Sequence, residues 1–194
     1  MPSERVLVAG VTGSGKTTFA RRLGEVWGLR HVEIDALFHG ADWTPRPEFL
    51  DDVSAFAGEE RWITEWQYTG RGTAPILGPR GQLAVWLDYP YRVVRRRLVT
   101  RTVSRSLLRT ELWNGNRERG LAKMFHPDPY ENILQWQKHT LHSWAERMPQ
   151  MQREYPQLEV LRFGHPREAE AWLRAQAEAS GVSIAPPKRR SRAR

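Results

Sequence analysis

The sequence predicts an α/β protein in which a mostly parallel sheet is covered by helices on both faces. Short apolar runs alternate with segments of helical periodicity along most of the chain, a pattern typical of strands joined by helical crossovers. With 194 residues, of which 40% are hydrophobic, the chain can bury one sizeable core. We therefore expect a single domain over residues 1–180 and a basic, disordered tail over residues 181–194.

Each expected element begins or ends at a recognisable turn signal. In the first half, the spacing predicts a strand at residues 6–9, a helix at 17–27, a strand at 31–34 ending at Asp35, a helix at 47–57 and a strand at 61–65. In the second half it predicts a strand at 83–87, a helix from Pro90 to about 108, a helix at 129–153, a strand at 158–163 and a helix at 166–179. Residues 110–128 show no regular period and are expected to be irregular.

The net charge of +8 is concentrated in two places. Nine arginines lie between Arg92 and Arg119 against two acids, and five basic residues with no acid lie between Lys188 and Arg194. This distribution predicts a local phosphate site and a separate solvated tail, which could bind nucleic acid weakly and non-specifically. A whole helix and strand are expected to separate the tail from the phosphate site.

Composition also excludes several kinds of site. No run approaches the ~18 apolar residues that a membrane span needs, and the absence of cysteine excludes disulfides and cysteine zinc sites. His126, His139, His142 and His165 lack a metal-ligand spacing. We expect a soluble cytoplasmic protein, and nothing in the sequence indicates its oligomeric state.

The segment Gly10-Val-Thr-Gly-Ser-Gly-Lys-Thr17 matches the phosphate-loop pattern G-x-x-x-x-G-K-S/T in full. Such a loop needs a strand that delivers it, glycines that let backbone N–H groups converge on phosphate oxygens, and a helix whose N-terminus faces the anion. The Lys16 ammonium is expected to reach the β- and γ-phosphates, and the Thr17 hydroxyl to ligate Mg²⁺. The predicted site for ATP and Mg²⁺ comprises Gly10, Thr12, Gly13, Ser14, Gly15, Lys16, Thr17 and Thr18.

From residue 5 to about residue 173, the chain resembles the adenylate kinase-like branch of P-loop kinases, and within it the small DNA topology modulation proteins. The resemblance is carried by the phosphate loop, Ile34-Asp-Ala-Leu-Phe38, Trp62-Ile-Thr-Glu65, Leu87-Asp88-Tyr-Pro90 and the closing helix at 167–173. It implies a three-layer P-loop NTPase fold with a five-stranded parallel sheet of order 2-3-1-4-5. It also places a mobile, helical lid insertion at about 101–128.

The resemblance assigns roles to two carboxylates. In the family, the third strand ends in an Asp-Gly pair that orients magnesium, and Glu65 and Trp66 stand there in this sequence. Glu65 is therefore a candidate behind the metal, with an exposed strand-end acid as the alternative. Asp35 is expected to orient the acceptor hydroxyl, with a helix cap as the alternative. Asp88 is interpreted mainly as a cap for the helix that opens at Pro90.

Arginines supply the next group of candidates. Arg97, Arg101, Arg105 and Arg109 recur every four residues and share one helix face, where like charges repel unless anions meet them. Arg97-Leu-Val-Thr-Arg101 resembles the adenylate kinase pattern in which the first arginine stacks on adenine and the second reaches phosphate.

Further candidates lie in the lid and in the aromatic residues. Arg117 and Arg119 are the lid candidates for stabilising transition-state charge, with an ordinary surface loop as the alternative. Trp43, Trp66 and Tyr68 could stack on a flat acceptor.

Taken with the resemblance, the loop predicts an ATP-dependent phosphotransferase that moves the γ-phosphoryl group to a small-molecule, nucleoside or nucleotide acceptor. Glu65 and Trp66 stand where the family has an Asp-Gly pair, and this difference disfavours simple adenylate kinase activity. Two alternatives remain: a nucleic-acid-associated ATP-binding protein, and an NTPase whose hydrolysis switches a partner.

Overall fold

Five parallel strands form one sheet in the computed structural model, which describes residues 2–108, 113–116 and 132–185. The order β2-β3-β1-β4-β5 is the one that the resemblance implies, so the predicted fold class is confirmed. The strands are β1 (Arg5–Gly10), β2 (Arg30–Val32), β3 (Trp62–Glu65), β4 (Leu83–Leu87) and β5 (Glu159–Phe163).

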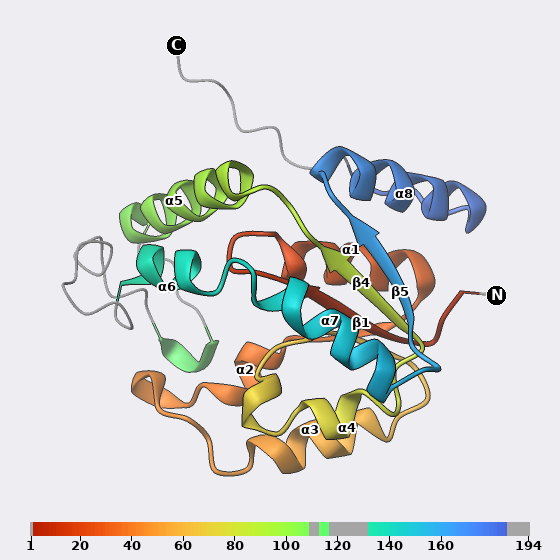
Figure 1. Ribbon diagram of the computed structural model, residues 1–194, viewed down its shortest axis with the longest axis horizontal. Coiled ribbons are helices and arrows are strands. Elements are labelled where there is room, and N and C mark those ends of the chain that lie inside the picture. Colours follow the sequence, from red (N-terminus) through yellow and green to blue (C-terminus); the bar gives the residue numbers. More distant parts are fainter. Residues whose placement is uncertain (1, 109–112, 117–131, 186–194) are drawn as a thin grey trace.

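Helices cover both faces of this sheet (Figure 1). They are α1 (Lys16–Trp27), α2 (Ile34–Phe38), α3 (Phe49–Ala57), α4 (Ala74–Leu77), α5 (Tyr91–Leu108), α6 (Ile133–His139), α7 (Ser143–Glu154) and α8 (Pro166–Ala179). Three short 3₁₀ turns lie at η1 (Ala41–Trp43), η2 (Thr69–Arg71) and η3 (Trp113–Gly115).

The central strand β1 separates two apolar clusters. Its Val6 and Val8 side chains join α1 and α8 on one face, and Leu7 and Ala9 join α2, α3, α4 and α7 on the other. Successive side chains of a strand point to opposite faces, so a strand covered on both sides reads as an unbroken apolar run. All four residues have no exposed surface, which makes the end of β1 a rigid base for the loop that follows.

The structure corrects several expected boundaries. The second strand ends at Val32, and Ile34 begins α2, so Asp35 lies in the first turn of a helix and does not end a strand. The helix expected at 129–153 is two helices, because the chain turns at Thr140, whose carbonyl accepts hydrogen bonds from the backbone N–H and the hydroxyl of Ser143. Residues 101–108 of the expected lid continue α5.

Across the described part of the chain, we find no helix with the length and apolar character needed to span a membrane.

The packing of α7 on the sheet yields a stability prediction. Trp144 of α7 is 6% exposed and its ring centroid lies 5.4 Å from that of the fully buried Trp66. We expect Trp144→Ala to lower the free energy of unfolding by about 3–5 kcal/mol, because it leaves a cavity in this cluster. Trp136→Ala is the control, since that ring is 39% exposed, and we expect it to cost about 1 kcal/mol or less. Equal losses in denaturant titrations would contradict this account of the core.

Candidate active site

The phosphate loop runs from the end of β1 to the start of α1, as the sequence predicts. Gly13 and Gly15 have φ angles of 89° and 95°, a region that favours glycine. A Cβ on Gly13 would also lie 2.5 Å from the Val94 carbonyl oxygen of α5. The loop therefore requires glycine at position 13 for both its backbone conformation and its close packing against α5.

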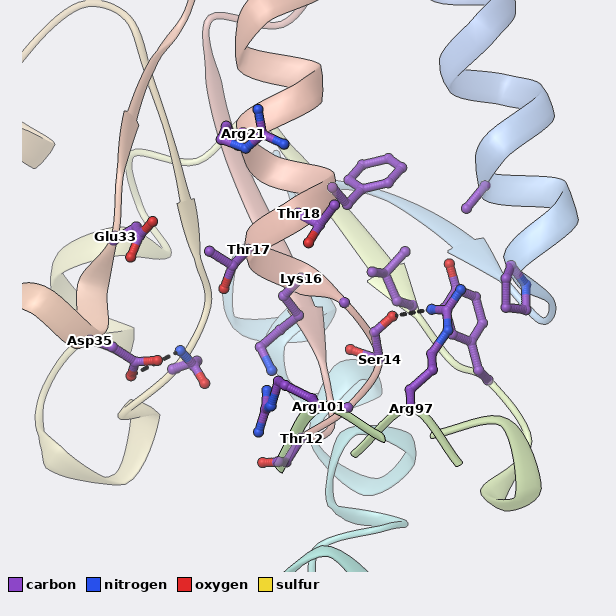
Figure 2. A pocket seen from close by; sticks show the side chains of 18 of the residues that line it. Thr12, Ser14, Lys16, Thr17, Thr18, Arg21, Glu33, Asp35, Arg97 and Arg101 are labelled. Carbon is purple, nitrogen blue, oxygen red and sulfur yellow. Dashed lines mark hydrogen bonds between the residues drawn. The ribbon is translucent and has the colours of Figure 1, made fainter. Parts of the chain in front are cut away.

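Lys16 extends from the first turn of α1 into a cavity (Figure 2). Its side-chain ammonium lies 3.4 Å from the Val11 carbonyl oxygen, and the residue is only 8% exposed. Burial lowers the pKa of Lys16 to about 8, Asp35 and Glu65 oppose that change, and Arg101 adds to it. A buried cation held near two carboxylates and an arginine is suited to bind a polyanion that neutralises the local positive charge.

One end of this cavity is lined by α5 and α8. Arg97 donates a 2.8 Å hydrogen bond from Nη1 to the Ser14 carbonyl oxygen, and its guanidinium lies 5.4 Å from the centroid of the Tyr89 ring (Figure 2). Phe19, Pro166 and Ala169 add apolar surface to this end, beside the charged side chains of α5 and α8.

The start of the tail lies closer to this cavity than the sequence suggested. Ala185 lines it, and its carbonyl accepts a 3.2 Å hydrogen bond from Arg22. The charged residues of the tail, Lys188 to Arg194, fall outside the described residues, so their expected separation from the site stays a prediction.

Glu65 is a buried carboxylate with several donors around it. Its Oε1 lies 3.2 Å from His31 Nε2, its Oε2 accepts from the Ile34 backbone N–H at 3.3 Å, and it accepts a hydrogen bond from the Thr17 side chain. Burial pushes its pKa up, but the hydrogen bonds from His31 and Thr17, together with the His31 charge, hold the pKa below its ordinary value. Glu65 is 1% exposed, so the alternative of an exposed strand-end acid is wrong.

The Thr17 and Glu65 pair fits Mg²⁺, which prefers oxygen ligands and keeps several waters. The described residues contain no group of three or more acidic, histidine or cysteine side chains that could hold a metal by themselves. A hydroxyl backed by one carboxylate, with phosphate oxygens and water completing the sphere, matches that donor set.

Asp35 faces the other end of the cavity, with one of its oxygens already engaged. Its Oδ1 accepts from the Tyr68 hydroxyl at 2.7 Å and from Gln67 Nε2 at 3.3 Å. The N-cap position of α2 belongs to Glu33, so the alternative of a capping role for Asp35 is wrong. Tyr68 has φ = 56°, an uncommon value for a bulky residue, and burial followed by the Asp35 charge raises its pKa far above its usual range. Tyr68 therefore stays protonated and donates to Asp35.

Two expectations about nearby side chains need correction. Trp66 is fully buried against Trp144 and cannot stack on an acceptor. Asp88 accepts hydrogen bonds at 2.9 and 2.5 Å from the Arg162 guanidinium, so it joins the ends of β4 and β5. Arg101 lies beside Lys16, as Figure 2 shows, whereas Arg109, Arg117 and Arg119 fall outside the described residues.

A short segment between α5 and α6, residues 113–116, lies against the acceptor end. Trp113 Nε1 donates to Glu33 Oε2 at 2.5 Å, and the Asn114 amide donates to the His39 carbonyl at 2.5 Å. Asn116 accepts from the Trp43 backbone N–H at 3.0 Å and donates to the Gly40 carbonyl at 2.7 Å. Sequence reasoning missed this docking, because the partners lie more than 70 positions away.

His39, Trp43 and Trp113 form the aromatic wall of this end. The His39 ring stacks on Trp113 at 6.1 Å and meets Trp43 edge-on at 5.1 Å. Burial lowers the pKa of His39, and the Asp35 charge only partly opposes that change. A neutral imidazole and two indoles beside a carboxylate can enclose a small ligand that presents both an apolar face and a hydroxyl.

Comparison with known proteins finds similarity to kinases. No family model matches the chain. A shikimate kinase from Synechococcus elongatus is 29% identical over 136 residues, which are 59% of this chain and 71% of that protein. Solved shikimate kinases from Acinetobacter baumannii, in complex with shikimate, and from Bacteroides thetaiotaomicron superpose with TM-scores of 0.51 and 0.52.

These superpositions cover 91% and 93% of this chain and 94% and 100% of the solved ones, at 17% and 13% identity, and they establish the fold alone. The sequence relative and the complete phosphate loop add the activity class. Together they support an ATP-dependent small-molecule kinase, and this part of the sequence-based prediction is confirmed.

The hydrogen bond between Tyr68 and Asp35 predicts a kinetic effect on the acceptor side of the kinase. We expect Tyr68→Phe to lower kcat with the phosphoryl acceptor about tenfold, because one hydrogen bond to a charged group no longer orients Asp35. The KM for ATP should stay within about twofold of the wild-type value. Tyr155→Phe is a matched control, since that hydroxyl donates to Glu154 at 2.7 Å outside the cavity. A Tyr68→Phe enzyme with wild-type kcat would show that Asp35 does not need this donor.

Proposed function

We propose that this kinase transfers the γ-phosphoryl group of ATP to a hydroxyl of a small acceptor bound between Asp35 and the aromatic wall of His39, Trp43 and Trp113. The observation that carries the proposal is that Lys16, Thr17 and Asp35 all face one cavity, with Glu65 behind Thr17. One cavity with a polyanion site at one end and a carboxylate at the other suits transfer between two bound molecules.

Each side chain then has a distinct task. Lys16 and the loop amides hold the phosphates, Thr17 ligates Mg²⁺, and Glu65 orients Thr17 and a metal-bound water. Mg²⁺ held by Thr17 would supply positive charge that offsets the negative charge of the phosphates. Asp35, through the oxygen that Tyr68 and Gln67 leave available, orients the acceptor hydroxyl and accepts its proton as the new P–O bond forms.

Arginines complete the proposal on the nucleotide side. Arg97 is assigned to the adenine end, where Tyr89 and Phe19 provide apolar surface, and Arg101 to the phosphates beside Lys16. Arg117 and Arg119 keep their sequence-based role as candidates for stabilising the transition-state charge. The narrower resemblance to DNA topology modulation proteins, and nucleic-acid binding by the basic tail, remain predictions from sequence.

The acceptor class can be tested by a screen that measures ADP release. The screen includes shikimate because the sequence relative is a shikimate kinase. It also includes other polyols, sugar acids, nucleosides and nucleoside monophosphates, because these carry hydroxyls for Asp35 and faces that can contact the aromatic wall. A kinase should hydrolyse ATP slowly until an acceptor is added. Rapid turnover that no acceptor accelerates would favour an NTPase switch and contradict the proposal.

Loss of the Lys16 ammonium should remove ATP turnover without unfolding the protein. We expect Lys16→Ala to lower kcat/KM for ATP by at least about a hundredfold, because the buried cation that contacts the phosphates is removed. Lys138→Ala is the control, since that lysine is exposed on α6 and should leave turnover unchanged. Steady-state ADP release and circular dichroism would check both variants. A folded Lys16→Ala enzyme with wild-type turnover would refute the kinase mechanism at this loop.

A further inference from the structure

Three carbonyl groups of the phosphate loop accept hydrogen bonds from identified donors. The Val11 carbonyl accepts from the Ser14 backbone N–H at 3.1 Å and from Lys16 at 3.4 Å. The Ser14 carbonyl accepts from Arg97 at 2.8 Å, and the Thr12 carbonyl accepts from Gln137 Nε2 at 2.7 Å. In a planar trans peptide the C=O and the following N–H point in opposite directions. Fixing the Thr12 carbonyl therefore fixes the direction of the Gly13 N–H.

Gln137 is an unusual residue for its position. It lies on α6 with no exposed surface, and a Cβ on Gly13 would lie 3.0 Å from its Nε2. Its Oε1 is buried and has no hydrogen-bond partner among the residues that the structure describes. A buried amide oxygen without a partner is unfavourable, so packing alone does not account for a glutamine here. What the side chain provides is the donor to Thr12.

The helix that carries Gln137 is itself held in place. The Asn132 side chain caps α6 by accepting from the Leu134 and Gln135 backbone N–H groups at 3.0 and 3.2 Å. Arg95 of α5 donates to the Leu134 carbonyl at 3.0 Å, and α5 and α6 lie together in Figure 1. Gln137 thus presents its amide to the loop from a fixed direction.

We propose that Gln137 is a positioning residue for nucleotide binding, which turns the Thr12–Gly13 peptide so that the Gly13 N–H faces the phosphates. It acts through the loop, since its amide nitrogen already donates to Thr12. The inference rests on the proposed function, because it needs a phosphate in the loop. Losing the Gln137 donor should therefore weaken the binding of ligands that carry phosphate and leave the binding of the nucleoside alone unchanged.

The test compares Gln137→Leu with Gln135→Leu, an exposed position on the same helix. Calorimetric titration of each full-length variant with ADP and Mg²⁺, and separately with adenosine, needs no acceptor. We expect Gln137→Leu to weaken ADP binding about tenfold, the effect of losing one well-formed hydrogen bond, and to leave adenosine binding unchanged. Gln135→Leu should bind both ligands as the wild type does.

Two results would overturn the inference. One is an ADP dissociation constant within twofold of the wild-type value, and the other is an equal weakening of ADP and adenosine, which would indicate general damage to the cavity. Should Gln137→Leu fail to fold, Gln137→Met keeps the side-chain length and removes the donor without adding a charge, and the same two comparisons apply to it. Wild-type protein that binds no ADP would instead refute the proposed function, and the inference with it.

Discussion

The direction of the peptide groups in the loop between β1 and α1 is the constraint on which the site depends. A triphosphate can be held there only if the amide N–H groups face the cavity and the carbonyls do not, since carbonyl dipoles repel anions. The fully buried β1 gives the loop a rigid start, Gly13 and Gly15 give it positive φ angles, and side chains from α5 and α6 hold its carbonyls. The rest of the cavity is arranged around this loop.

Two carboxylates beside the loop have different partners, and those partners separate their roles. Burial raises the pKa of Glu65, but the hydrogen bonds from His31 and Thr17 keep that pKa below its ordinary value, so Glu65 stays ionised behind the hydroxyl that would meet the metal. Asp35 is held by Tyr68 and Gln67 at the acceptor end, with a second oxygen left for a ligand. Burial of Lys16 lowers its pKa to about 8, and these two carboxylates offset part of that effect. Arginines of α5 also line the cavity, so its net charge stays positive and suits a polyanion.

The acceptor end is completed by a segment from a distant part of the sequence. Trp113, Asn114 and Asn116 hydrogen-bond to the Glu33–Trp43 region, and Trp113 covers the His39 ring. Residues 113–116 of the expected lid thus contact the acceptor side, whereas Arg101, in the same expected lid, lies beside Lys16. Trp113 and the loop at His39, as well as Asp35, should accordingly limit the size of the acceptor that can bind.

The sequence by itself determined the α/β class and the phosphate loop, because strand and helix periods and the loop motif are local and spaced along the chain. The kinase activity was predicted from that loop taken with the resemblance. The sequence also pointed to Glu65 and Asp35 as the relevant carboxylates. It could not show that Asp35 lies in a helix or that Trp66 is buried away from the acceptor site. Nor could it show that Tyr68, Gln137 and Asn116 form hydrogen bonds with residues far away in the sequence. Those outcomes depend on contacts between residues some 30 to 125 positions apart, which only the packing of the helices against the sheet decides.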